Sequence, residues 1–262
     1  MNTMFKEIRH GDIEKIRARI TKNPAVVNEI YTGTRPKKDI GQSPLQVAVK
    51  CGQFEIIDLL LDNGADPDFM ENRTDQPADT NDYYFMPMPV LCGAISGAFD
   101  SLPYSEFERS ENYVKLIARL LELGADPDKE SYPHPLLGHT VLPLQTLATA
   151  ANEILHRYGE SGYEREQKFD AAKKHLFEIL DLLKKYGADF DLWLNREFSN
   201  GNTNRWAYLD DFIPVADKPY EIEYRGKIVK GVTKGDVDFR KEIRAALQEY
   251  FKVNQLLNDH LM

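Results

Sequence analysis

Apolar side chains recur at helical spacing at four places along the chain. The stripes are Ile13, Ile16 and Ile20; Phe54, Ile57, Leu60 and Leu61; Val114, Ile117, Leu120 and Leu121; and Phe177, Leu180 and Leu183, where Lys184 takes the fourth position. Each set lies on one face of a helix with 3.6 residues per turn. The pattern therefore predicts four related amphipathic helices, of which the last is the loosest copy.

A short phrase follows each of the last three stripes and predicts how the helix ends. It reads GADPD at residues 64–68 and 124–128, and GADFD at residues 187–191. Glycine adopts the left-handed conformation that closes a helix at little cost, and aspartate bonds to nearby backbone. Repetition at a long period indicates a stacked architecture, in which each unit buries its apolar face on its neighbours.

The fullest unit spans residues 41–69. Ser43 is predicted to cap a first helix over residues 45–51, Pro44 suits its first turn, and Gly52 ends it before the second helix. This order of a Pro-Leu-polar-X-Ala helix, a glycine break, an apolar helix and Gly-Ala-Asp-Pro-Asp resembles the ankyrin repeat, a turn or finger followed by two antiparallel helices. The resemblance implies an all-α fold and binding along a surface.

The chain departs from the family pattern at one position in three units. Family members carry a histidine after Pro-Leu that bonds between adjacent units, whereas Gln46, Cys92 and Gln145 stand here. Glutamine can take over such a bond. The glycine phrases also lie about twice the usual period apart, so the third and fourth units carry insertions.

The organisation that follows is an ankyrin-type helical solenoid with long finger loops and a C-terminal cap. The array covers residues 1–192, with units at about 1–30, 41–69, 90–129 and 140–192. An insertion is expected between the helices of the third unit, at residues 99–111, and the fourth unit is expected to have helices over 144–158 and 164–186. The capping segment, residues 193–262, is predicted to contain a short helix at 205–212, a β-hairpin over 220–232 and a long helix over 237–261 that Asp236 caps.

The charge balance narrows the class of partner. The 262-residue chain carries a net charge of −9 and has a pI of about 5.3. Nucleic acid and anionic membranes both favour cationic surfaces, so the charge argues against either as the main partner and permits a basic protein. The start has no apolar signal core, no run is long enough to span a bilayer, and Cys51 and Cys92 are expected to be free thiols, so we expect a cytoplasmic protein.

Motifs for chemistry are lacking in the sequence. The six histidines are scattered, and none pairs with a cysteine or carboxylate at a recognised metal-ligand spacing. There is no glycine-rich phosphate loop and no GxSxG. We therefore expect no catalytic residues, no metal and no cofactor. A small enzyme in the C-terminal segment is the alternative, and the scarcity of histidine and the lack of cysteine there weigh against it.

Candidate partner-binding residues lie on the fingers and on the first helices, which line the concave face in the ankyrin family. They are Arg35, Lys37, Lys38, Val49, Lys50, Tyr83, Tyr84, Phe85, Met86, Met88, Ile95, Tyr132 and His134. Aromatic residues and methionine are enriched in interface cores, so the run at 83–88 fits a finger tip that anchors a partner. The alternative is that the run folds back as a plug between the second and third units. Val49 and Ile95 fit either a binding groove or packing between helices.

The sequence thus predicts a non-catalytic module that binds another protein through its concave face and fingers. Two narrower hypotheses stay open. Similar short, acidic ankyrin proteins with degenerate repeats look like immunity proteins that neutralise a basic toxin. An adaptor or host-directed effector is the other.

Overall fold

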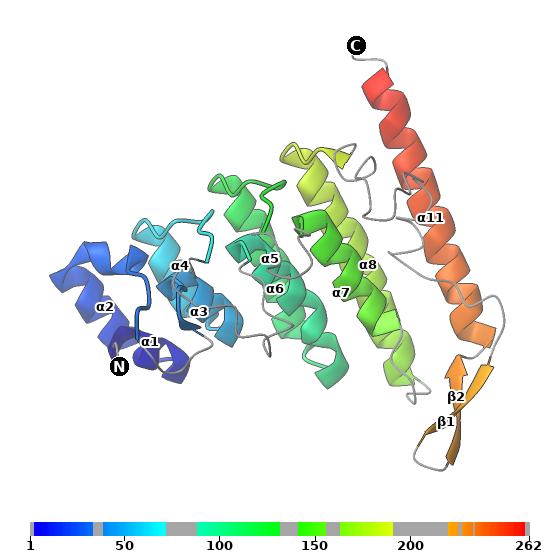
Figure 1. Ribbon diagram of the computed structural model, residues 1–262, viewed down its shortest axis with the longest axis horizontal. Helices are drawn as coiled ribbons and strands as arrows, with labels where there is room; N and C mark the ends of the chain where they lie inside the picture. The colour runs from blue at the N-terminus through cyan, green and yellow to red at the C-terminus, as the bar shows by residue number, and fades with distance from the viewer. Residues whose placement is uncertain are drawn as a thin grey trace.

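Helix pairs stand side by side in one row along the computed structural model, whose labels follow Figure 1. The structure describes residues 3–33, 39–71, 88–131, 141–155, 163–190, 220–224, 227–232 and 234–259. The pairs are α1 (Thr3–His10) with α2 (Ile13–Lys22), α3 (Pro44–Cys51) with α4 (Phe54–Asp62), α5 (Val90–Asp100) with α6 (Phe107–Glu122), and α7 (Pro143–Leu155) with α8 (Tyr163–Lys185). Short 3₁₀ helices are η1 (Pro24–Asn28) and η3 (Leu102–Tyr104).

The first helix of each pair contacts the first helix of the next, so α1, α3, α5 and α7 form one layer. The second helices form the other layer, in which α2 contacts α4 and α6 contacts α8. The predicted stripes lie between the layers: Ile16, Ile57, Leu60, Ile117 and Leu180 are among the buried residues of a single core cluster. Each pair therefore buries its apolar face on its neighbours, as the pattern predicted.

The start and end of α3 confirm the expected local signals. Ser43 Oγ accepts a hydrogen bond from the backbone N–H of Gln46 at 3.2 Å, and Gln46 Oε1 accepts one from the N–H of Ser43 at 3.4 Å, which together form a capping box. Gly52 ends the helix with φ of 66°. Gln46 also donates from Nε2 to the carbonyl of Met88 at 2.9 Å, so this glutamine bonds to the segment that leads into the next unit.

Cys92 occupies the corresponding position in α5. It is a buried free thiol. Burial raises the pKa of the Cys92 thiol to about 12, so it stays protonated at neutral pH. Cys51 is half-buried, and both cysteines are free, as expected.

A series of hydrogen bonds, here called the turn ladder, joins the repeated phrases of successive pairs. Asn28 Oδ1 accepts from the backbone N–H of Asp66 at 2.8 Å. Asp68 Oδ1 accepts from the N–H of Asp126 at 3.0 Å, and Asp128 Oδ2 accepts from the N–H of Asp189 at 2.7 Å. The second aspartate of each phrase thus holds the first aspartate of the next, so the ladder sets the register between units.

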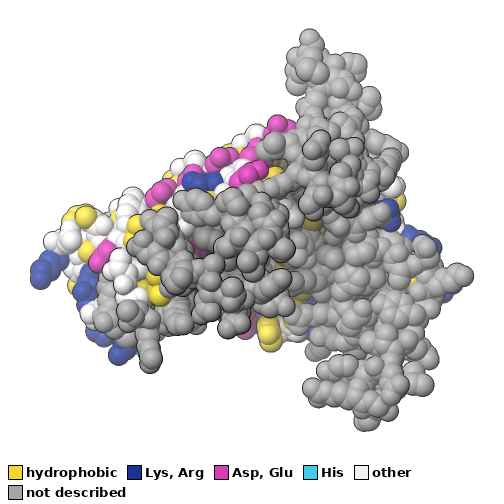
Figure 2. Space-filling model, viewed as in Figure 1, with side chains coloured by type: hydrophobic (Ala, Val, Ile, Leu, Met, Phe, Trp, Pro, Cys, Tyr) yellow, Lys and Arg dark blue, Asp and Glu magenta, His cyan; other side chains and the backbone are white. Residues whose placement is uncertain are grey.

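The glycines of the phrases hold the conformation that the ladder needs. Gly64, Gly124 and Gly187 have φ of 84°, 98° and 88°, the left-handed region that favours glycine. In each phrase the glycine and the alanine after it donate backbone hydrogen bonds to carbonyls of the preceding helix. Asp and Glu side chains gather along this edge of the molecule (Figure 2).

The three finger loops begin and end at fixed points. Backbone hydrogen bonds join Tyr31 to Gly41 and Gln42 at 2.9 Å, and Ser131 to Val141 at 2.9 Å. Met70 pairs with Pro89 in an isolated antiparallel bridge. The loops are therefore closed at their bases, whereas their interiors lie outside the described residues.

The insertion of the third pair differs from the expectation. It was predicted as a connection over residues 99–111, but α5 extends to Asp100 and α6 already begins at Phe107. Most of the inserted residues therefore lengthen α5 and α6, and η3 lies between these two helices. The fourth pair agrees with its predicted long helices within a few residues at each end.

The C-terminal part supplies a further helix, α11 (Lys234–Asp259), which packs on the row beside α8 (Figure 1). Ile243 and Leu247 are buried in the core cluster. The ring of Tyr250 lies 6.4 Å from that of Phe177, and Lys184 Nζ lies 5.9 Å from the Tyr250 ring centre. The polar interruption of the fourth stripe is thus explained, because Lys184 faces α11.

Strands β1 (Tyr220–Tyr224) and β2 (Lys227–Val232) precede α11 and pair antiparallel, with Tyr224 opposite Lys227. The expected cap at Asp236 is wrong, because α11 begins at Lys234 and Asp236 lies inside its first turn. The predicted short helix at 205–212 lies outside the described residues. None of the helices described here is long and apolar enough to cross a membrane.

The turn ladder makes a testable contribution to stability. D128A removes the oxygen that accepts from the N–H of Asp189, and we expect it to lower the free energy of unfolding by about 1 kcal/mol. D128N keeps an acceptor oxygen. Burial raises the pKa of Asp128, as do the charges of Asp126 and Asp189, so the Asp128 charge itself opposes folding at neutral pH. D128N should therefore be as stable as the parent in urea unfolding followed by circular dichroism. Equal losses in the two variants would contradict this role.

Candidate functional site

A groove of about 600 Å³ opens between α3 and α5, and η3 and the start of α6 form one of its sides. We call it the α3–α5 groove. Among the residues that line it are Gln46, Val49, Lys50, Met88, Gly93, Ser96, Gly97, Tyr104, Arg109 and Tyr113. Its volume lies in the range of about 300–1,000 Å³ found for ligand pockets, which is room for a few side chains of a partner.

The floor of the groove is low because α5 presents small residues there. Gly93, Ser96 and Gly97 follow one another at helical spacing. Tyr113 of α6 lies against Gly97, is 3% exposed, and donates from its hydroxyl to the carbonyl of Val49 at 2.7 Å. The ring of Phe54 meets that of Tyr113 edge-on at 4.9 Å. Tyr113 thus links the second pair to the third directly beneath the groove.

Charged groups of both signs surround the groove. Lys50 Nζ lies 3.9 Å from the carboxylate of buried Asp39. Arg109 donates to the carbonyl of Cys51 and to the carboxylate of Glu106, both at 3.3 Å. Burial raises the pKa of Tyr113, so its hydroxyl remains a donor at neutral pH. These contacts fix the sides of the groove, and neither sign of charge dominates there.

Tyr104 is the most exposed large apolar side chain among the described residues. It belongs to η3, lines the groove, and is 74% exposed. Its ring offers apolar area and a hydroxyl at little ordering cost, which is typical of interface anchors. Tyr104 therefore offers an exposed aromatic ring at the groove against which a partner could pack.

The structure brings only part of the predicted site together. Val49, Lys50 and Met88 line the α3–α5 groove. Ile95 is fully buried and packs in the core, so of the two alternatives for this residue the structure supports packing between helices and not contact with a partner. Val49 is 2% exposed, so it too serves packing first. The other predicted residues lie outside the described residues: Arg35, Lys37, Lys38, Tyr83, Tyr84, Phe85, Met86, Tyr132 and His134.

Sequence reasoning missed Tyr104, Arg109 and Tyr113. Tyr104 and Arg109 lie in the insertion, where no repeat motif assigns a face to them, and Tyr113 directly precedes the third stripe. The signal available was an aromatic residue next to a proline in a polar stretch, at residues 103–104. That signal alone does not indicate that the insertion folds onto the first helices.

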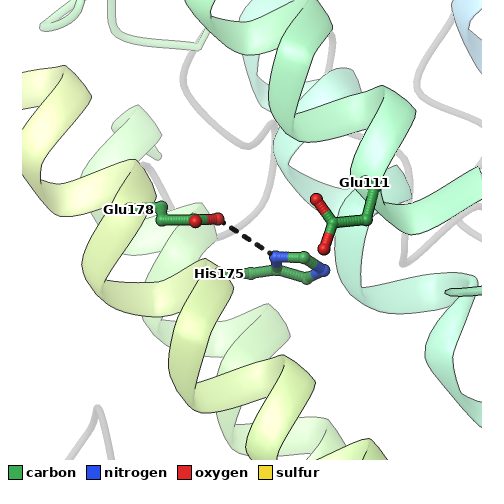
Figure 3. A group of neighbouring side chains, drawn as sticks. All are labelled: Glu111, His175 and Glu178. Carbon is green, nitrogen blue, oxygen red and sulfur yellow. Dashed lines mark hydrogen bonds and ion pairs between the residues drawn. The ribbon is translucent and has the colours of Figure 1, made fainter. Parts of the chain in front are cut away.

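A second group of polar side chains meets where α6 and α8 pack together (Figure 3). Glu111 comes from α6, and His175 and Glu178 come from α8. His175 is 1% exposed, and its Nδ1 lies 3.5 Å from Glu178 Oε2. Burial lowers the pKa of His175, and this outweighs the opposing effect of the two carboxylates. A neutral imidazole thus lies between two acidic side chains.

No metal-ligand spacing was expected around any histidine, but the structure brings His175 close to two carboxylates. His175 and Glu178 are three residues apart on α8, so they share one face of the helix. Glu111 is distant in sequence, and only the contact of α6 with α8 brings it near.

Comparison with known proteins identifies one segment. The ankyrin repeat family model matches residues 40–72, which hold α3, α4 and the turns on either side. Residues 40–72 therefore match the ankyrin repeat, in agreement with the resemblance seen in the sequence. A search of the curated proteins found no relative.

Substitution by alanine at the two glycines of the groove floor should have opposite effects on stability. A Cβ at Gly97 would lie 2.5 Å from a ring atom of Tyr113, which is pinned, whereas a Cβ at Gly93 would meet Val49 Cγ1 at an ordinary 3.7 Å. We expect G97A to destabilise the protein by about 1–3 kcal/mol, the usual cost of overpacking. G93A should be neutral or stabilising, since alanine favours helix by about 1 kcal/mol. Thermal unfolding of both variants checks this, and a G97A as stable as G93A would contradict the packing described.

Proposed function

We propose that this protein is a non-catalytic binding module that holds a partner protein in the α3–α5 groove, with Tyr104 as an anchor. The observation that carries the proposal is the groove itself. Small residues of α5 form its base, hydrogen-bonded side chains form its sides, and the strongly exposed Tyr104 lies at its edge. Ankyrin repeats generally bind other proteins, and the matched repeat supplies one wall, α3.

The architecture supports binding along a surface. Stacked repeats present extended faces on which neighbouring units each contribute contacts. The groove lies between the second and third pairs, so a segment that enters it touches the first helices of both. Its walls are fixed before binding by the bonds of Tyr113 and Arg109, which lowers the ordering cost of association.

A basic partner suits the charge of this protein. The net charge is −9, and acidic side chains gather along the edge that carries the turn ladder (Figure 2). Opposite charges steer association and raise its rate. Neutralisation of a basic toxin is one form that such binding takes; an adaptor or effector role is the other.

Photo-crosslinking tests the groove directly. Tyr104→benzoylphenylalanine places a reactive group at the groove, and Arg17→benzoylphenylalanine places the same group on α2, at a side chain that is 55% exposed. In cells that produce the protein, we expect one protein to be crosslinked from position 104 and not from position 17. Y104A should then weaken its binding by about tenfold or more, as loss of an anchor does.

The same experiment can overturn the proposal. If positions 104 and 17 give the same products, or if Y104A binds the captured protein as well as the parent does, the groove is not the contact surface. Unchanged thermal unfolding of Y104A serves as the control for folding.

The acidic edge predicts a salt-sensitive association rate with the captured protein. D66N/D126N removes two charges from the turn ladder but keeps the acceptor oxygens that bond Asp68 and Asp128. We expect slower association, because fewer negative charges attract a basic partner. The salt dependence should also be weaker, because salt screens charges beyond a Debye length of about 10 Å at 0.1 M and fewer charges remain to be screened. The matched control is E14Q/E108Q, which removes two charges at the first turns of α2 and α6, the helix ends away from the ladder. Equal effects of the two pairs would exclude local steering by the acidic edge.

A further inference from the structure

The contact between α6 and α8 holds a set of side chains that protein binding in the α3–α5 groove does not use. Glu111, His175 and Glu178 each offer a donor atom, and these atoms all lie within 4.8 Å of one another (Figure 3). The imidazole is buried, whereas the side chains of Glu111 and Glu178 are 40% and 41% exposed. A buried imidazole between two carboxylates from different helices calls for a role.

We propose that Glu111, His175 and Glu178 bind a divalent first-row transition ion, with Zn²⁺ as its representative, at the α6–α8 contact.

The donor set suits this class of ion. Imidazole nitrogen and carboxylate oxygen together are ligands of zinc and its neighbours, whereas calcium and magnesium take oxygen alone. A metal binds the neutral form of histidine through a ring nitrogen, and a ring nitrogen of His175 lies within 4.8 Å of an oxygen of each glutamate. Three protein ligands leave a fourth position for water, as in open zinc sites.

The geometry requires a small rearrangement. Donors bound at about 2.0–2.2 Å lie about 3.4 Å apart around a tetrahedral ion, so the cluster must contract. The two glutamates are half-exposed and can rotate, whereas the buried imidazole stays in place. A shallow groove of about 430 Å³, lined by Glu111, Val114, Lys115, Glu178 and Leu182, lies beside the cluster and gives an ion and its water access.

Lys174 is the natural competitor for the two carboxylates. Its Nζ lies 2.6 Å from a carboxylate oxygen of Glu111 and 3.8 Å from one of Glu178. One ammonium neutralises half of the charge of two carboxylates, whereas a divalent ion neutralises all of it. Binding therefore requires that Lys174 swing away, which its exposed side chain permits.

An ion at this position would join the third helix pair to the fourth. Glu111 belongs to α6 and the other two ligands belong to α8, so coordination adds a link across a contact otherwise made by side-chain packing and the Lys174 ion pair. Because the three ligands come together only in the folded state, metal binding would then raise the melting temperature.

Calorimetry with Zn²⁺ on the chelator-treated full chain tests the proposal. We expect saturable binding of one ion per chain together with a rise in the melting temperature. E111Q and E178Q should each weaken binding by about tenfold or more, as loss of a ligand does, whereas E122Q, which alters an exposed glutamate on the same helix as Glu111, should not. K174M should tighten binding because it removes the competing ammonium.

Co²⁺ supplies a second readout that does not depend on stability. Visible absorption of the Co²⁺-loaded protein reports nitrogen and oxygen coordination, and H175A should abolish it while E122Q leaves it intact. The proposal is overturned if Zn²⁺ does not bind saturably, if E111Q and E122Q bind it equally well, or if K174M weakens binding. In each of those outcomes the cluster acts as an ion-pair network that holds α6 against α8.

Discussion

The turn ladder is the constraint on which the rest of the structure depends. A single helix pair cannot bury its apolar stripe by itself, so each pair needs a neighbour at a fixed height and angle. The carboxylates of Asp68 and Asp128 supply that fixed relation, because each accepts a backbone hydrogen bond from the next phrase. Asn28 performs the same task for the first pair. The ladder thus explains why the two aspartates of the phrase repeat as faithfully as the core stripes.

The two candidate sites arise where the chain departs from the repeat. Tyr104 and Arg109 at the α3–α5 groove, and Glu111 at the α6–α8 contact, all lie in the insertion at residues 99–111. This segment lengthens α6 backwards and adds η3, which brings the groove wall to one side of the third pair and Glu111 to the other. The regular repeat builds the scaffold, and the irregular segment adds the features that a ligand can recognise.

The end of the row shows how a solvent-facing surface is covered. The fourth stripe lacks a full apolar set because Lys184 interrupts it, and α11 meets this face with Tyr250, Ile243 and Leu247. Ring contacts of Tyr250 with Phe177 and Phe190, and the ion pair of Lys173 with Glu242, join α11 to the last unit. The C-terminal helix therefore takes the place that another repeat would occupy.

The sequence by itself determined the local structure and the repeat. Helical stripes, the Ser43 cap, the left-handed glycines and the family resemblance are properties of short segments, so they could be predicted correctly. The tertiary structure alone decided which side chains meet. It buried Ile95, placed Tyr104 at the groove, and set Glu111 beside His175, because contacts between units depend on how an insertion folds. Spacing along the chain carries no information about residues that approach one another only when two helix pairs pack.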